Sequence, residues 1–277
     1  MAHIVMVDSN AIGISLIPTA KRLGHEVSFM SSPAFAHFYQ GRNAQAAVAL
    51  ADRLIQVEDS TDVSCVTRHF AALQRILPID AAIAFWDATM LAAAKACSTL
   101  AVRFTSEKGV EQALRKDVTR SLLSEAGLES CRFGIATAKE EALHIAREIG
   151  FPVVFKPRVG YGKYMTELID SETAIHRYFE TFEAARQAMP QVNRSAIDQI
   201  LLVEERVLGC MYSVEVGMVN STMVPFMITQ RKRAADNEIL ELGSTMPAPV
   251  SQAQASEILD YTEKVLRVIG LDLGIFH

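Results

Sequence analysis

A lysine at the end of an apolar run is followed at once by a glycine-rich loop. The run that starts at Phe151 delivers Lys156, and after Pro157 the chain continues with Arg158, Gly160, Tyr161, Gly162 and Lys163. Glycines let backbone N–H groups approach an anion closely, and lysine ammonium groups supply compact positive charge. No G-x-x-x-x-G-K-[ST] pattern occurs, so this is not a Walker loop. The stretch favours phosphate binding, although a solvated lysine beside a turn explains it about equally well.

Two further groups of charged residues lie before and after this loop in the sequence. Lys116 and Arg120 are four residues apart and share one face of a predicted helix, where a solvated basic stripe is the simpler explanation. The acidic segment Glu204-Glu205-Arg206-Val207 follows a β run, and Tyr212-Ser-Val-Glu215 follows that segment. Their order, with a lysine helix, a lysine strand, a glycine loop and an acidic hinge, raises the odds of a functional site.

Length and charge narrow the class of protein. A chain of 277 residues fits about two domains, and 50% hydrophobic with 21% charged residues can fill packed cores. The formal net charge of −5 argues against a nucleic-acid binder, because the phosphate backbone rewards basic surfaces. A small anionic ligand is still compatible, since a few local lysines outweigh a weakly negative total.

Cysteine spacing and the N-terminus point to a reducing compartment. Cys65, Cys97, Cys131 and Cys210 form no C-x-x-C pair, so neither a zinc site nor a disulfide framework is indicated. The N-terminus reads as a strand without a basic region or a long apolar segment, and no later segment is a candidate membrane span. We expect a cytoplasmic protein that does not contact membranes.

The first part of the chain alternates strands and helices. Runs rich in apolar residues predict strands at residues 3–7, 26–30, 53–57 and 81–85, with helices between them at about 14–23 and 63–77 and a further helix at 89–96. Such alternation predicts an α/β, doubly wound parallel sheet, and we place this Rossmann-like domain at residues 1–105. The first loop has one glycine where G-x-G-x-x-G needs three, which argues against a dinucleotide-dependent dehydrogenase.

The second part, residues 106–277, has a different pattern. Helices open it, and strands are predicted at residues 131–136, 151–156, 164–169, 200–203, 212–216 and 223–229, with helices at 139–149 and 171–189. Strands that follow one another with short connections predict an antiparallel arrangement, so we expect an α+β domain.

Six segments of this second part, taken together, resemble the ATP-grasp superfamily of ligases. They are K-x-x-x-R at Lys116, F-P-V-V-x-K-P at Phe151, E-E-x-h-x-G at Glu204, Y-S-V-E at Tyr212, E-L-G-S-x-x-P-A-P at Glu241 and G-L-x-x-G-x-F-H at Gly270. The first domain resembles the pre-ATP-grasp domain that usually precedes them. Within the superfamily, the chain is most similar to carboxylate–amine ligases, which include the L-amino-acid ligases.

The resemblance implies roles for individual residues. Lys116 and Lys156 would contact the phosphates of ATP, and the loop from Arg158 to Lys163 would close over the β- and γ-phosphates. The adenine would lie against the hinge formed by Glu204, Glu205, Arg206 and Val207. Met211 stands where relatives often carry an acidic residue for the ribose, so the resemblance leaves ribose recognition to Glu205 or another group.

The resemblance also implies magnesium, a mechanism and partners. In relatives the metal-binding carboxylates come after the G-x-F-H segment that here ends at His277, so we expect no metal ligand in this chain and interpret it as lacking the C-terminal end of a longer ligase. The implied reaction joins a small-molecule carboxylate to an amine through an acyl phosphate, with no nucleic acid or membrane partner. The resemblance is also compatible with a homodimer. The 277-residue chain alone is then expected to be inactive. A catalytically silent nucleotide-binding module, and a carboxylase-like or purine-pathway ATP-grasp enzyme, are the alternatives.

Overall fold

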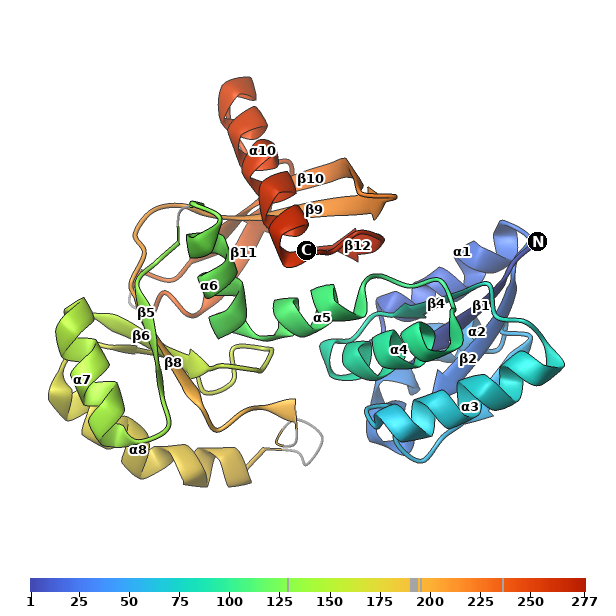
Figure 1. Ribbon diagram of the computed structural model, residues 1–277, viewed down its shortest axis with the longest axis horizontal. Helices are drawn as coiled ribbons and strands as arrows, with labels where there is room; N and C mark the ends of the chain where they lie inside the picture. Colours follow the sequence, from blue (N-terminus) through green and yellow to red (C-terminus); the bar gives the residue numbers. More distant parts are fainter. Residues whose placement is uncertain (129, 190–193, 195, 236) are drawn as a thin grey trace. The chain divides into compact units, whose positions relative to one another are not determined.

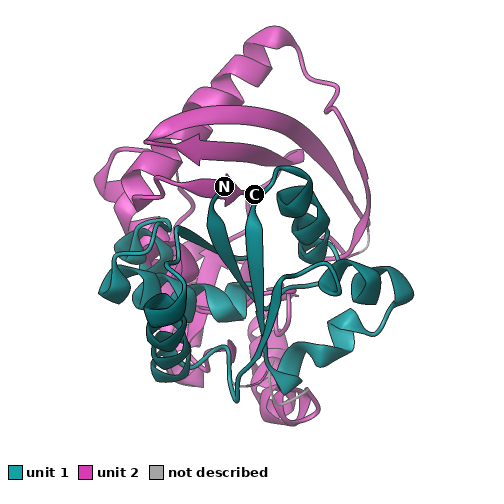
Figure 2. Ribbon diagram, turned by 90° about the vertical axis from the view of Figure 1, so that its right-hand side faces the viewer, with its two compact units in different colours: residues 1–111 teal, residues 112–277 magenta. Residues whose placement is uncertain are grey.

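The chain folds into two compact units, residues Met1–Glu111 and Gln112–His277 (Figure 2). The computed structural model describes residues 1–277 apart from residues 129, 190–193, 195 and 236. The division falls inside helix α5 (Glu107–Leu114), whereas the boundary predicted from sequence, between residues 105 and 106, lies just before that helix. Within the described residues, no helix combines the length and the apolar composition needed to cross a membrane.

Unit 1 is built on a four-stranded parallel sheet with the order β3-β2-β1-β4. Its elements are β1 (His3–Val7), α1 (Leu16–Arg22), β2 (Glu26–Ser31), α2 (Arg42–Val48), β3 (Arg53–Gln56), α3 (Val63–Ile76), β4 (Ala81–Ala84) and α4 (Asp87–Leu100), with 3-10 turns at Gly13–Ser15 and Pro33–Tyr39. The order reverses at β1, as in doubly wound folds. The parallel sheet predicted from the sequence is therefore confirmed.

Both faces of this sheet are covered, which explains the nearly continuous apolar sequence of its central strand. Val5 and Val7 of β1 pack with the core formed around α3 and α4, whereas Met6 packs with the core around α1 and α2. Successive side chains of a strand point to opposite faces, so each face of β1 needs its own apolar residues.

Unit 2 contains two four-stranded antiparallel sheets, with the orders β5-β8-β6-β7 and β11-β10-β9-β12 (Figure 1). Its elements are α6 (Lys116–Glu125), β5 (Phe133–Ala136), α7 (Lys139–Ile149), β6 (Val153–Pro157), β7 (Glu167–Ile169), α8 (Glu172–Gln187), β8 (Leu201–Glu205), β9 (Met211–Val219), β10 (Thr222–Arg233), β11 (Glu241–Thr245), α10 (Gln252–Ile269) and β12 (Gly274–Phe276). Helices α7 and α8 cover one face of the first sheet, and α10 covers one face of the second.

One segment assignment made from the sequence is wrong. The sequence predicts a hinge that starts at Glu204, but Glu204 and Glu205 both belong to strand β8, and the connecting segment begins at Arg206. Glu204 lies between Phe133 of β5 and Val154 of β6 in the ladder. Glutamate has a low strand propensity, so local sequence alone predicts that β8 ends before Glu204. Pairing with strands on both sides keeps the two glutamates in β8.

Candidate functional site

The alternation of side chains along β6 and β8 sends one lysine and one glutamate to the same face of the first sheet. Val153 and Phe155 of β6, with Leu201 and Val203 of β8, pack against α7 and α8. The residues between them therefore point to the opposite face, where Lys156 and Glu204 meet as a diagonal pair.

Glu204 binds two cations at once, one on each carboxylate oxygen. Its side chain is 5% exposed; Oε2 lies 2.5 Å from Lys156 Nζ, and Oε1 accepts a hydrogen bond of 2.9 Å from Arg120 Nε. Burial raises the pKa of Glu204, but Lys156 and Arg120 lower it by more, so the net pKa lies below the usual value. The group is therefore a buried carboxylate that stays charged, with two cations around it.

Helix α6 connects this carboxylate to the glycine loop. Arg120 lies one turn after Lys116 on the helix, and Lys116 Nζ donates to the carbonyl of Gly160 at 2.7 Å. The backbone N–H of Lys116 also donates to the carbonyl of Arg158 at 3.2 Å. One face of α6 thus contacts both the loop and the carboxylate that holds Lys156.

The loop after β6 has an unusual backbone. Gly162 has φ +65°, and the non-glycine residues Lys163 and Met165 have φ +58° and +57°. Left-handed conformations cost about 1–2 kcal/mol for non-glycine residues and tend to cluster at functional sites. A Cβ added at Gly162 would lie 3.0 Å from the ring of Tyr164, so the turn needs glycine there.

Two residues of the loop reach other parts of unit 2. Lys163 donates to the carbonyl of Ile239 at 2.9 Å and forms an ion pair with Glu241 of β11. Arg158 instead pairs with Asp198 at 2.6 Å, on the chain segment that leads into β8. The ring of Tyr161 meets that of Tyr164 edge-on, with ring centres 6.4 Å apart.

The connecting segment between β8 and β9 is tied to the β10–β11 connection. Arg206 forms an ion pair with Glu238, and Arg233 donates to the carbonyl of Gly209 at 2.9 Å. Val207 is 63% exposed, so an apolar side chain is open to solvent beside these ion pairs. An exposed apolar residue in a fixed segment suits contact with a planar ligand.

Two further predicted nucleotide-binding residues, Glu205 and Met211, stand at the ends of the strands on either side of this segment. Glu205 pairs with Arg132 at 3.1 Å, and Met211 opens β9 opposite Arg231. The contacts of Glu205 and Met211 are thus made with different residues, and ribose binding by either stays a prediction.

A second polar cluster lies on the face of the second sheet that α10 does not cover. Glu215 of β9 accepts hydrogen bonds from Ser213 and Thr229, and His277 Nδ1 lies 3.0 Å from its Oε1. Arg231 lies 3.9 Å from Glu215 and 3.6 Å from Glu241. Through Glu241, the cluster is joined to Lys163 of the loop.

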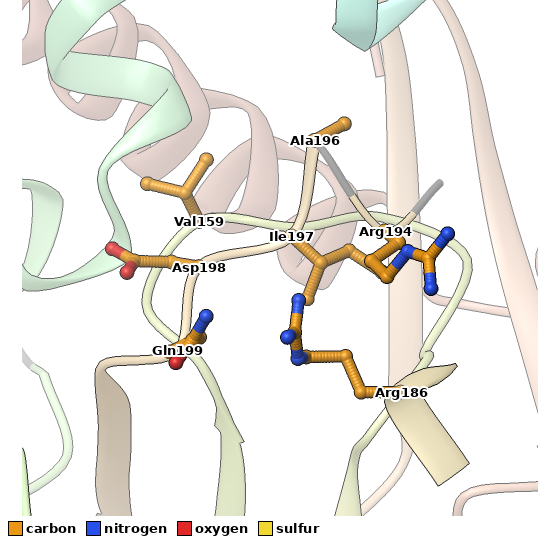
Figure 3. A pocket seen from close by; sticks show the side chains of 7 residues that line it. All are labelled: Val159, Arg186, Arg194, Ala196, Ile197, Asp198 and Gln199. Carbon is orange, nitrogen blue, oxygen red and sulfur yellow. The ribbon is translucent and has the colours of Figure 1, made fainter. Parts of the chain in front are cut away.

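A pocket of about 580 Å³ lies beside the loop rather than over the lysines. Figure 3 shows its lining residues: Val159, Arg186, Arg194, Ala196, Ile197, Asp198 and Gln199. Among them only Val159 belongs to the predicted phosphate loop, and none of the three predicted lysines, Lys116, Lys156 and Lys163, lines the pocket. This pocket therefore does not coincide with the site predicted from the sequence.

In the described part of unit 2 there is no group of three close metal-ligand side chains. Among the residues that the structure describes, the one group of three metal-ligand side chains within 4.8 Å of one another is Glu58, Cys65 and His69, in unit 1. Arg68 already contacts both Glu58 and the Cys65 thiol there. All four cysteines are free thiols.

Comparison with known proteins identifies both units. A family model for the ATP-grasp N-terminal domain matches residues 17–102, and one for the ATP-grasp domain matches residues 149–277. A protein of Sinorhizobium fredii, described as uncharacterized protein y4rH, is 22% identical over 99% of this chain and 53% of its own length.

Solved structures show the same fold at low identity. An L-amino acid ligase from Bacillus licheniformis is similar with a TM-score of 0.78 and 17% identity, over 99% of this chain and 62% of that one. The biotin carboxylase domain dimer of Hydrogenobacter thermophilus 2-oxoglutarate carboxylase, in complex with MgADP, ADP and bicarbonate, has a TM-score of 0.75 and 18% identity, over 98% and 58%. This chain thus spans less than two thirds of the length of each of these relatives.

Proposed function

Because this chain belongs to the ATP-grasp family, we propose that unit 2 binds ATP and forms part of a carboxylate–amine ligase. The phosphates would contact Lys156 and Lys116, and the glycine loop would cover them. Adenine would lie on the segment from Arg206 to Val207. The reaction would activate a carboxylate as an acyl phosphate, which an amine then attacks.

The observation that carries this proposal is the convergence of Lys156, α6 and the glycine loop. Lys156 is held at Glu204, Arg120 of α6 is held at the same carboxylate, and Lys116 of α6 contacts the loop at Gly160. Transfer of a phosphoryl group is mostly a matter of positioning and charge neutralisation, which fixed cations and backbone donors supply. Magnesium, when bound, would help to neutralise the charge of the triphosphate.

Amino acids are the substrates that the second polar cluster supports best. Glu215 and Glu241 offer carboxylates to an ammonium group, and Arg231 between them offers a guanidinium to a carboxylate. A cluster that contains both carboxylates and a guanidinium is complementary to the ammonium and carboxylate groups of an amino acid. Their connection to Lys163 would set this cluster next to the γ-phosphate when the loop closes.

Nucleotide affinity tests the first part of the proposal. The 277-residue chain should bind ATP and ADP in titration calorimetry, and Lys156→Met should weaken both about tenfold or more, because a charge-assisted contact worth roughly 1.5–3 kcal/mol is lost. Lys264→Met, at an exposed position of α10, is the matched control and should bind as the unchanged chain does. Equal affinity of the Lys156 and Lys264 variants would contradict the assignment of Lys156.

Phosphate release tests the second part. The full-length gene product should release phosphate from ATP in the presence of magnesium and a suitable pair of amino acids, and its Lys156→Met form should not. Nucleotide binding without release for any pair of amino acids would favour a silent nucleotide-binding module instead.

A further inference from the structure

A thiol, an imidazole and a carboxylate meet at the start of helix α3 in unit 1. Cys65 and His69 are four residues apart on α3 and so share one face of the helix, and Glu58 belongs to the loop between β3 and α3. The Cys65 thiol donates to Glu58 Oε2 at 3.2 Å, and His69 Nδ1 lies 3.8 Å from Cys65 Sγ. The proposed nucleotide site uses none of these residues, since it belongs to unit 2.

The distances between these atoms match those between the ligands of one tetrahedral metal ion. With a zinc–sulfur distance of about 2.3 Å and zinc–nitrogen or zinc–oxygen distances of about 2.0–2.1 Å, the sulfur lies about 3.5 Å from each of the other two ligand atoms. The observed distances of 3.2 and 3.8 Å lie on either side of that value. Small side-chain movements are therefore enough to close the three groups around an ion.

The kinds of donor atom favour Zn²⁺. Thiolate and imidazole suit zinc, whereas Mg²⁺ and Ca²⁺ take oxygen ligands. Cys65 is 5% exposed and the side chain of Glu58 is 75% exposed, so the three side chains leave a fourth position on the solvent side. The spacing of the cysteines alone indicates no zinc site, because the other two ligands come from a histidine one helical turn away and from the preceding loop.

The loop that carries Glu58 is already held beside the helix. Asp62 caps α3 by accepting a hydrogen bond of 2.6 Å from the backbone N–H of Cys65. Ser60, which is buried, donates to Asp8 at 2.5 Å. A ligand that lies beside its partners before the ion arrives loses little conformational freedom on binding.

Arg68 shows that positive charge is favourable at this place. Its Nη2 donates to Glu58 Oε2 at 3.0 Å and to Cys65 Sγ at 3.8 Å. The side chain of Arg68 is 60% exposed, and exposed ion pairs contribute little to stability, so the guanidinium can leave for water. Arg68 is therefore a competitor of the ion, which gives the site a specific test.

We propose that Glu58, Cys65 and His69 form a zinc-binding site in unit 1, with water as the fourth ligand. On binding, the S–H bond of Cys65 breaks, its proton goes to solvent, and the thiolate sulfur binds Zn²⁺. In the free site His69 Nδ1 donates to the Cys65 carbonyl at 2.9 Å. Its proton moves through solvent to Nε2, and Nδ1 then binds the ion. The Glu58 carboxylate exchanges Arg68 for Zn²⁺.

Cobalt(II), which has an absorption spectrum where Zn²⁺ has none, tests the site in the 277-residue chain. It should bind one to one with a sulfur-to-cobalt charge-transfer band, and Zn²⁺ should displace it with a dissociation constant of about 10 μM or less. Cys65→Ser should abolish the band, and His69→Gln should weaken binding about tenfold or more. Cys210→Ser and His144→Gln, at exposed positions of unit 2, are the matched controls and should change neither. A band that survives Cys65→Ser, or saturation with Zn²⁺ only above about 10 μM, would overturn the proposal.

Arg68→Met gives a readout that nonspecific binding of the ion to the surface would not produce. Removing the competitor should raise the Zn²⁺ affinity about threefold, the size of an exposed ion pair. Arg75→Met removes the same charge at an exposed position further along α3 and should change the affinity less than about twofold, because distant surface charges are screened by salt. Equal Zn²⁺ affinities of the two variants would refute the proposal.

Chemical labelling of the unchanged protein covers the case in which a variant fails to fold. Diethyl pyrocarbonate should modify His69 several-fold more slowly when Zn²⁺ is added, with His144 reacting equally in both conditions, as read by peptide mass spectrometry. Equal slowing at the two histidines would show adventitious binding only and would overturn the proposal, as would an unchanged rate at His69. Nucleotide does not enter any of these measurements, so their outcome is independent of the proposed function.

Discussion

Replacing Glu204 by glutamine should destabilise unit 2 by about 2 kcal/mol at neutral pH. The change removes one charge and keeps the shape of the side chain. Two charge-assisted hydrogen bonds, each worth roughly 1.5–3 kcal/mol, are weakened, while the amide is less costly to bury than the carboxylate. The two cations are 20% and 30% exposed and can regain water, so the loss stays below the roughly 3–5 kcal/mol typical of a broken buried pair.

The pH dependence of this loss follows from the lowered pKa of Glu204. A carboxyl group whose pKa is lower in the folded state stabilises the protein above its unfolded pKa, and the contribution disappears as the pH falls through the folded value. The difference between the unchanged protein and Glu204→Gln should therefore be full at pH 7 and shrink steadily below about pH 4.5.

Urea unfolding at several pH values measures this effect, with two signals that separate the units. The only tryptophan, Trp86, lies in unit 1, so its fluorescence reports that unit, while far-UV circular dichroism includes unit 2. In a separate thermal unfolding experiment at neutral pH, the melting temperature of unit 2 should fall by roughly 4–8 °C. Glu172→Gln, at an exposed ion pair with Arg147, is the control and should stay within about 0.5 kcal/mol. Parallel pH curves for Glu204→Gln and the unchanged protein would refute the reasoning.

Two further predictions concern the loop and unit 1. Gly162→Ala should lower the stability by about 1 kcal/mol and weaken nucleotide binding, because φ at this residue is +65° and the ring of Tyr164 lies 3.0 Å from the added Cβ. Gly243→Ala is the control: nothing lies within 4 Å of the added Cβ, so neither the stability nor the nucleotide affinity should change. Burial raises the pKa of Asp8, so its contribution to stability is present below about pH 4 and is lost as the pH rises through the raised value. Asp8→Asn should remove this pH dependence from the Trp86 unfolding curve, and an unaltered curve would show that Asp8 does not titrate as described.

Local sequence determined the regular elements of this protein well. The helix predicted at residues 139–149 is observed with the same bounds, Lys139–Ile149, because it combines a periodic apolar face with a glycine immediately after its end. The strands of the parallel sheet follow from short apolar runs, and their alternation with helices is enough to fix a parallel arrangement. These signals lie within a few residues of one another, so a single sequence carries them.

The connecting segment after β8 shows where local signals end. Two consecutive glutamates read as the start of a hinge, yet Glu204 continues the strand because β5 and β6 pair with it from both sides. Those partners are about 50–70 residues away in sequence. A propensity measured along the chain contains no information about a strand that arrives from elsewhere.

The partner of each charged side chain was decided by tertiary structure alone. The sequence placed Lys116 and Arg120 on one helix face and Lys156 at the end of a strand, which is enough to nominate a phosphate site. It could not show that Glu204 would bind Arg120 and Lys156 together, because that contact joins residues up to 84 positions apart. Helical and strand periodicity fix the direction of a side chain within its own element. The packing of separate elements decides which charged group that side chain meets and how deeply it is buried, and these two factors set its pKa.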